Sequence, residues 1–338
     1  MPNTKQNSQQ ECLSTANLSI GYRNVESQHT VLENLNLSLY SGQLVALLGA
    51  NGSGKSTLIR TLCSLQSALS GEVILPSNMG KNTASMAKEI AVVLTSHVYA
   101  PHFRVYDMVS SGRYPYTNWL GKLSKQDHEI VEHAIHLVGI EHLAKRLVHQ
   151  LSDGERQKMM IAKALAQSSS IIILDEPTSH LDIVNRVEIT KLLQKLATVD
   201  NKAILMATHD LDLAIQSANR LWLMDGNGVE VGAPEDLILN SKLQKVFGAL
   251  SSDFDHFTGS FKINIALNKT IYLAQNNASL EEIWVEKALK KIGYRISENT
   301  DEALKLNWNK EDSTWHLKDN NAFFQFENIG DLIDYLAN

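Results

Sequence analysis

The chain has 338 residues, of which 43% are hydrophobic and 20% are charged, so it can bury a sizeable core and form two domains. Its net charge of −6 argues against a nucleic-acid partner, because nucleic-acid-binding proteins usually present a basic face. No apolar run approaches the roughly 18–20 residues that span a bilayer.

The amino-terminal segment and the cysteines bear on location. The first 17 residues are polar and lack the apolar core of a signal peptide, and we expect residues 1–12 to form a flexible tail. The two cysteines, Cys12 and Cys63, match no metal-ligand spacing and cannot build a disulfide framework. They indicate a reducing cytoplasm.

A glycine-rich loop follows the apolar run at residues 44–48, which is typical of a buried strand. An amphipathic helix follows at residues 58–62. Between them is the pattern G-x-x-x-x-G-K-S, in the strand–loop–helix setting of a phosphate-binding loop. It is formed by Gly49, Ala50, Asn51, Gly52, Ser53, Gly54, Lys55, Ser56 and Thr57.

Glycines in such a loop let backbone N–H groups turn toward phosphate oxygens, and the helix N-terminus adds its dipole. We therefore expect this cradle to bind ATP or GTP. Lys55 is expected to reach the β- and γ-phosphates, and the Ser56 hydroxyl to ligate Mg²⁺.

Two further apolar segments end in residues suited to phosphate chemistry. Residues 171–174 lead into Asp175 and Glu176, and residues 203–208 lead into His209. All-apolar strands are typical of a parallel sheet covered on both faces, and ligands bind at the carboxyl ends of such strands. We expect Asp175 to hold Mg²⁺, Glu176 to act as general base toward water, and His209 to donate a hydrogen bond to the γ-phosphate.

Taken alone, these features have more ordinary explanations. An Asp–Glu pair after an apolar strand more often starts a turn or helix, and an isolated histidine is more often structural. Because both features occur together with the cradle, we interpret the Asp–Glu pair and the histidine as parts of a phosphate site.

A third motif begins about twenty residues before the apolar run at 171–174. Residues 151–157 read LSDGERQ and open a helix that runs through Ala166. They resemble the LSGGQ signature of ABC-type ATPases, and Ser152 and Gly154 match it. Asp153 and Glu155 depart from the commonest form of the signature.

Other positions resemble the same family in the same order. Residues 179–182, which end at Asp182, resemble the D-loop, and residues 208–210 resemble the switch-histidine segment. Tyr22, which follows a strand at residues 18–21, resembles the aromatic residue that stacks on adenine; packing at a strand end is the alternative. The resemblance covers about residues 13–255.

The resemblance implies an α/β fold, a P-loop NTPase of ABC type with a RecA-like mixed sheet core. An N-terminal antiparallel β subdomain and a helical subdomain at about residues 97–168 complete it. ATP and Mg²⁺ are the implied cofactors. The family forms head-to-tail homodimers, in which Ser152, Gly154 and Asp182 of one chain would complete the nucleotide site of the other.

One family residue is missing. Residues 92–94 are apolar and typical of a buried strand, but Thr95 occupies the position where the family has a glutamine that senses Mg²⁺ and the attacking water. The Thr95 hydroxyl can still donate or accept a hydrogen bond, directly or through water, so it stays a candidate metal ligand. Alternatively, Ser96 or His97 supplies the contact, or coupling depends on the loop alone. Because the other catalytic residues are present, we expect a working ATPase.

Residues 105–116, VYDMVSSGRYPY, resemble the segment V-x-D/E-x-V-x-x-G-R-x-P-Y of ATPases that drive bacterial uptake of ferric siderophores, haem or cobalamin. In that branch the region faces a polytopic membrane permease. We therefore expect residues of about 95–120, including the aromatic side chains and Arg113, to contact a permease; an ordinary helical surface is the alternative.

This branch implies a peripheral protein at the cytoplasmic face of the inner membrane, which works indirectly with a periplasmic or surface solute-binding protein. An ABC-type exporter ATPase and a soluble non-transport ABC ATPase are the alternatives. Against DNA-repair types, only 38 residues separate Thr57 from Thr95, without sustained heptads. The sequence does not identify the solute.

A second domain is expected after a boundary near residues 250–258. Residues 251–338 hold 14 acidic and 9 basic side chains, so most of the negative charge lies there. A strand at residues 269–273, a helix that begins with the capping box of Ser279 and Glu282 and stops at Gly293, three strand-like pieces and a second helix at 328–336 predict a small α+β domain with about four strands.

We place this extension at residues 258–338 and expect a regulatory or dimerising role by analogy. The first helix carries apolar residues on one face: Leu280, Ile283, Trp284, Ala288 and Ile292. We expect Trp284, Trp308 and Trp315 to form the core of the domain.

Overall fold

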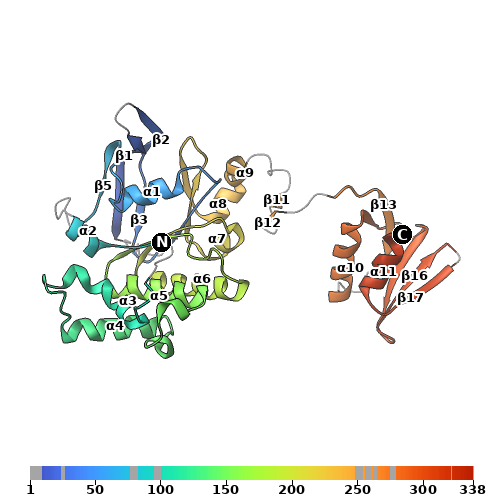
Figure 1. The fold of residues 1–338 in the computed structure, drawn as a ribbon. Coiled ribbons are helices and arrows are strands. Elements are labelled where there is room, and N and C mark those ends of the chain that lie inside the picture. Colours follow the sequence, from blue (N-terminus) through green and yellow to red (C-terminus); the bar gives the residue numbers. More distant parts are fainter. Residues whose placement is uncertain are drawn as a thin grey trace, which may run out of the picture. The chain divides into compact units, whose positions relative to one another are not determined.

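The computed structural model describes residues 10–23, 27–76, 83–94, 100–247, 254–255, 260–261, 265–274, 279–320 and 322–337. The chain divides into two compact units, residues 1–261 and residues 262–338 (Figure 1). Each unit has its own hydrophobic core. Within the described residues, no helix combines the length and the hydropathy that a membrane crossing requires.

An antiparallel sheet opens the first unit. Strand β1 (Glu11–Arg23) pairs with β2 (Gln28–Leu35), β3 (Ser38–Tyr40) and β5 (Ser70–Ile74). The strand expected at residues 18–21 is part of β1, but β1 begins earlier. Cys12 is buried in the core beneath this sheet, so residues 11 and 12 do not belong to the tail that the sequence predicted.

A six-stranded sheet forms the centre of the unit, in the order β10-β9-β4-β8-β7-β6. Neighbouring strands run parallel, except that β10 is antiparallel to β9. Alternate residues of β4 enter two different cores: Ala46 and Leu48 join one, Val45 and Leu47 the other. The sheet is covered on both faces, which explains its apolar strands. The strands are β4 (Leu44–Gly49), β6 (Ile90–Val93), β7 (Ile171–Asp175), β8 (Ala203–Ala207), β9 (Arg220–Met224) and β10 (Val229–Gly232).

Helices cover the two faces of this sheet. Leu58 and Leu62 of α1 pack with Val45, whereas Ile189 and Leu193 of α6 pack in the other core. The remaining helices and strands of the first unit outside the helical subdomain are α1 (Lys55–Leu62), α2 (Thr83–Glu89), α6 (Ile183–Thr198), α7 (Leu211–Ser217), α8 (Pro234–Leu239), α9 (Lys242–Phe247), β11 (Phe254–Asp255) and β12 (Ser260–Phe261).

The helical subdomain contains α3 (Val105–Ser110), a 3-10 helix (Ser111–Tyr116), α4 (Lys125–Leu137) and α5 (Asp153–Ala166), with two further 3-10 turns (Glu141–Leu143 and Val148–Gln150). Helix α4 begins at Lys125, because Ser124 and Asp127 form a capping box. A Cβ on Gly112 would lie 2.3 Å from the carbonyl oxygen of Lys163 in α5. This close approach explains why the 105–116 segment carries glycine there.

The sequence predicted that Arg113 would lie on the surface and contact a permease. In the structure Arg113 is buried, with 6% of its surface exposed. Its Nε donates to Asp127 Oδ1 at 2.8 Å, and its Nη1 donates to the Ala166 carbonyl oxygen at 2.9 Å. The guanidinium carbon also lies 4.0 Å from the centroid of the Tyr116 ring. Arg113 therefore joins the 3-10 helix to α4 and α5, and the expectation of a contact residue was wrong.

The second unit is a five-stranded sheet in the order β14-β13-β15-β16-β17 with two helices. Strand β13 is parallel to β14 and β15, and the remaining pairs are antiparallel. The sequence predicted about four strands and missed β14, which follows Gly293 directly. The elements are β13 (Lys269–Leu273), α10 (Leu280–Lys291), β14 (Tyr294–Ser297), β15 (Leu304–Asn309), β16 (Thr314–Asp319), β17 (Ala322–Phe326) and α11 (Ile329–Ala337).

The core of the second unit contains two of the three tryptophans expected there. Trp315 is buried, and Trp308 packs against it at 4.9 Å between ring centroids. Trp284 is 58% exposed, because α10 turns Val285 and Leu289 toward the sheet instead. The helix carries two overlapping apolar faces. The sequence pattern predicted that the face with Trp284 packs on the sheet, whereas the face with Val285 and Leu289 does so.

The Arg113–Asp127 pair predicts a pH-dependent stability. Hydrogen bonds from Ser124, with the Arg113 guanidinium beside them, lower the pKa of Asp127 to about 2, below the unfolded value near 3.8. Its contribution is therefore complete at neutral pH and is lost as the pH falls from about 5 to about 2. Asp127→Asn is expected to cost about 2–4 kcal/mol at neutral pH, because Arg113 stays buried without its partner.

Urea unfolding at neutral pH and at about pH 3 measures this effect. The matched control is Glu129→Gln, whose exposed pair with Lys125 spans 3.9 Å and is expected to change stability by less than about 0.5 kcal/mol. Equal midpoints for the two variants would contradict the assignment.

Candidate functional site

The site begins with the loop between β4 and α1. The backbone turns at Gly52 and Gly54, with φ angles of 80° and 100°, which residues with a side chain rarely adopt. A Cβ on Gly49 would lie 2.6 Å from the Met224 carbonyl oxygen, and a Cβ on Gly54 would lie 2.4 Å from Val31 Cγ1. The loop therefore needs its glycines for conformation and for space.

The cradle contains polar groups suited to an anionic ligand. Ser53 Oγ is buried without a hydrogen-bond partner, which is costly unless a bound group satisfies it. Lys55 Nζ donates to the carbonyl oxygens of Gly49 and Ala50 at 2.8 and 3.1 Å. Burial lowers the pKa of Lys55, and two nearby carboxylates partly offset this. Asn51 is exposed at the tip. A partly desolvated cation, an unsatisfied hydroxyl and a glycine loop fit a phosphate chain.

The two acids expected at the end of β7 lie beside the cradle. Ser56 Oγ donates to Asp175 Oδ2 at 3.3 Å, so the two oxygen ligands expected for Mg²⁺ lie together. Glu176 Oε2 lies 3.4 Å from His209 Nδ1. Glu176 is held in a left-handed conformation, with φ of 49°, and its backbone N–H donates to the Ala207 carbonyl oxygen at 3.0 Å. Parallel pairing of β7 and β8 produces this arrangement.

Tyr22 reaches the cradle from β1. Its hydroxyl and the Thr57 hydroxyl of α1 are 2.8 Å apart, and its side chain is 46% exposed. A cavity of about 420 Å³ lies beside it, lined by Gly21, Tyr22, Arg23, Gln66, Ser67, Ala68 and Leu69. The exposed ring is therefore available for stacking next to the phosphate cradle.

The signature residues stand at the start of α5, in the helical subdomain (Figure 1). Ser152 caps the helix: its Oγ accepts from Glu155 N at 3.3 Å, and the Glu155 carboxylate accepts from Ser152 N at 2.8 Å. This capping box satisfies two helix N–H groups, and a glutamate at position 155 serves it well. Of the two departures from the signature, Glu155 thus has a structural reason.

Sequence reasoning missed Asn185. Its backbone N–H and its side-chain amide both donate to the Asp182 carboxylate, each at 2.8 Å. A Cβ on Gly154 would lie 2.5 Å from Asn185 Oδ1, so the signature packs against the first turn of α6, directly after the D-loop. Asp182 caps α6, and an asparagine three residues after a capping aspartate was the available signal.

Thr95, Ser96 and His97 lie outside the described residues. Their roles as candidate ligands stay predictions.

Two family models match the chain. The model described as "ABC transporter" matches residues 32–179, which contain the cradle, the signature, Asp175 and Glu176. The model described as "Iron ABC transporter C-terminal domain" matches residues 268–337, which form most of the second unit.

Curated relatives match over most of their length. The "Probable siderophore transport system ATP-binding protein YusV" of Bacillus subtilis is 38% identical, over 70% of this chain and 85% of the relative. The "Petrobactin import ATP-binding protein FpuC" of Bacillus anthracis is 34% identical, over 70% of this chain and 87% of the relative.

Solved structures share the fold of the first unit. CbiO1 from Clostridium perfringens, described as part of the ABC transporter complex cbiONQ, has a TM-score of 0.59 and 27% identity, over 70% of this chain and 93% of its own. The cassette MJ0796, described as a dimer in a post-hydrolysis state bound to ADP and Pi, has a TM-score of 0.57 and 25% identity, over 66% of this chain and 98% of its own.

The cradle glycines provide a matched pair of substitutions. Gly52→Ala is expected to cost about 1–2 kcal/mol for its positive φ alone, because nothing lies within 4 Å of its added Cβ. Gly54→Ala is expected to cost about 1–3 kcal/mol more, since its Cβ also meets Val31. Urea unfolding of the two variants measures the difference. Equal losses would show that packing does not require the second glycine.

Proposed function

This chain belongs to the ABC transporter ATP-binding proteins, which are ATPases, and on that premise we propose that it powers the uptake of an iron chelate, a ferric siderophore or haem, or of cobalamin. One observation carries the proposal: an ATP-hydrolysing unit is followed, in the same chain, by a domain that matches iron ABC transporters over residues 268–337. The names of the two curated relatives, which refer to siderophore transport and petrobactin import, support the same class of solute.

The positions of the side chains support definite roles in hydrolysis. Lys55, now held by two carbonyl oxygens, would turn toward the β- and γ-phosphates of ATP. Ser56 and Asp175 would hold Mg²⁺, with Thr95 as the candidate third protein ligand, and the ion would neutralise charge on the phosphates. Glu176 would accept a proton from the attacking water.

His209 lies where it can serve the same step. Its Nδ1 stands 3.4 Å from the Glu176 carboxylate, and its side chain is 58% exposed, so the imidazole is free to turn toward the γ-phosphate. The left-handed backbone at Glu176 supports this reading, because strained residues concentrate at functional sites.

We propose that two copies pair head to tail, so that the signature of one copy completes the cradle of the other. The α5 N-terminus carries Ser152 and the backbone of Gly154, an arrangement suited to a phosphate. Beside Asp182, Ile183 and Val184 are 77% and 67% exposed, and exposed apolar side chains next to polar ones are typical of an interface. The similar cassette described as a dimer supports the same assembly.

A permease contact is supported by exposed apolar residues in and just after the 3-10 helix. Tyr114, Trp119 and Leu120 are 60%, 91% and 66% exposed, and Tyr114 lies in the 105–116 segment typical of iron-chelate and cobalamin importers. Aromatic side chains of this kind anchor protein–protein interfaces. Arg113 is not part of this surface. The proposed location is therefore the cytoplasmic face of the inner membrane.

Glu176→Gln tests the ATPase and the transport step together. The variant is expected to hydrolyse ATP about 10²–10³-fold more slowly, because the amide accepts no proton from water, while ATP affinity stays within about threefold of the original. In cells that lack the native gene, it is expected not to restore uptake of a radiolabelled ferric siderophore. Glu235→Gln, at an exposed position in α8, is the matched control. Restored uptake with the Glu176 variant would overturn the assignment.

Trp119→Ser tests the membrane contact. The variant is expected to reduce the membrane-associated fraction of the protein in its host by about tenfold, since a buried aromatic anchor is worth about 2 kcal/mol or more, while ATP affinity is unchanged. The control is Val199→Ser. Val199 is 70% exposed and lies at the C-terminal end of α6, outside the 95–120 region. Equal membrane fractions for the two variants would exclude Trp119 as an anchor.

A further inference from the structure

A second cavity lies at the opposite edge of the central sheet from the cradle. It has a volume of about 510 Å³ and is lined by Gln126, Glu129, Ile130, His133, Ala134, Leu137, Leu165, Ser168, Leu196, Asp200 and Lys202. The cradle follows the carboxyl ends of β4 and β7, whereas Ser168 precedes β7 and Asp200 precedes β8. The cavity is therefore separate from the nucleotide site.

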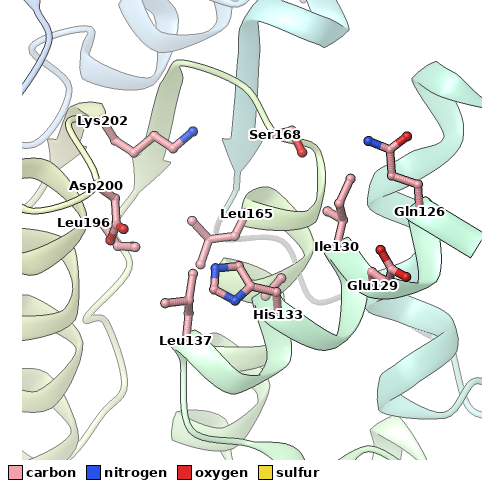
Figure 2. Close-up of a pocket in the computed structure, with 11 residues that line it drawn as sticks. Gln126, Glu129, Ile130, His133, Leu137, Leu165, Ser168, Leu196, Asp200 and Lys202 are labelled. Carbon is pink, nitrogen blue, oxygen red and sulfur yellow. The ribbon is translucent and has the colours of Figure 1, made fainter.

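The cavity has a mixed lining, with its apolar side chains gathered from three helices. Ile130 and Leu137 of α4 face Leu165 of α5 and Leu196 of α6, and Figure 2 shows the His133 ring between Leu165 and Leu137. Its volume falls in the range of about 300–1,000 Å³ that is usual for small-molecule sites. Helices of the helical subdomain and of the sheet core both contribute to it.

One wall of the cavity carries the side-chain ammonium of Lys202. Lys202 Nζ donates to the Ser169 carbonyl oxygen at 2.6 Å, which leaves two of its three donors. Burial lowers the pKa of Lys202, and Asp200 only partly offsets this. Among the residues that the structure describes, no carboxylate forms an ion pair with Lys202.

The acidic groups of the cavity do not supply the missing partner. Figure 2 shows the Asp200 carboxylate directed away from the Lys202 ammonium, and Glu129 lies on the far side of the cavity. Glu129 Oε1 is instead 3.9 Å from Lys125 Nζ. A partly desolvated ammonium beside an apolar surface favours a ligand that brings its own negative charge and an apolar body.

We propose that this cavity binds a small carboxylate with an apolar chain or ring. The carboxylate accepts from Lys202 Nζ, and the apolar body lies against Ile130, Leu137 and Leu165. Because α4 and the α6–β8 connection both contact the ligand, it links the helical subdomain to the sheet core. The ligand changes their relative position only if it binds one arrangement more tightly than another.

Titration calorimetry with the full chain tests the proposal, with octanoate as the probe. Octanoate is expected to bind saturably at one site, octanol at least about fivefold more weakly, and acetate without measurable heat, because charge and apolar body both contribute. Lys202→Met is expected to weaken octanoate binding at least about tenfold. Lys195→Met, at an exposed position of α6, is the matched control and is expected to stay within about twofold.

A cavity-filling variant guards against a folding artefact. Ile130→Trp is expected to abolish octanoate binding while ATP affinity, measured on the same sample, is unchanged. The proposal is overturned if octanoate fails to saturate, if octanol binds equally well, or if Lys202→Met binds as the original does. ATP hydrolysis plays no part in these measurements, so their outcome is independent of the proposed transport function.

Discussion

Parallel pairing of β4, β8 and β7 is the constraint on which the chemistry of this protein depends. Strand β4 begins 127 residues before β7, and β7 begins 32 residues before β8, but their carboxyl ends meet at one edge of the sheet. Such pairing requires long crossovers, and burial on both faces keeps the strands in register. Lys55, Asp175 and His209 therefore gather at one place because each follows one of these strands.

Several groups at this edge of the sheet have unfavourable surroundings that a bound phosphate would improve. Lys55 is partly desolvated and rests on two carbonyl oxygens, Ser53 Oγ has no partner, and Glu176 keeps a left-handed backbone. Each feature costs free energy in the isolated chain. Phosphate oxygens offer acceptors to both the lysine and the serine, which is why the cradle suits a nucleotide better than a neutral molecule.

The helical subdomain is held together internally by contacts of a different kind. Gly112 lets the 3-10 helix approach the backbone of α5, and the buried Arg113 donates to the Asp127 carboxylate, the Ala166 carbonyl oxygen and the Ser168 hydroxyl. Removing either partner would leave the other charge buried and uncompensated. Tyr114, which is exposed, lies on the 3-10 helix that these contacts hold in place.

Local pattern was sufficient for the cradle, the strand ends, the capping box at Ser279 and the placement of the chain among ABC-type ATPases. These features depend on backbone conformation, on periodicity and on caps within a few residues, so neighbours in the sequence encode them. Tertiary structure decided the rest: the burial of Cys12 and Arg113, the side of α10 that faces the sheet, the contact of Gly154 with Asn185, and the placement of Lys202 against the Ser169 carbonyl oxygen. Each of these depends on which distant segment packs against the residue, and an amphipathic helix or a lone arginine offers more than one acceptable partner until the surrounding core is formed.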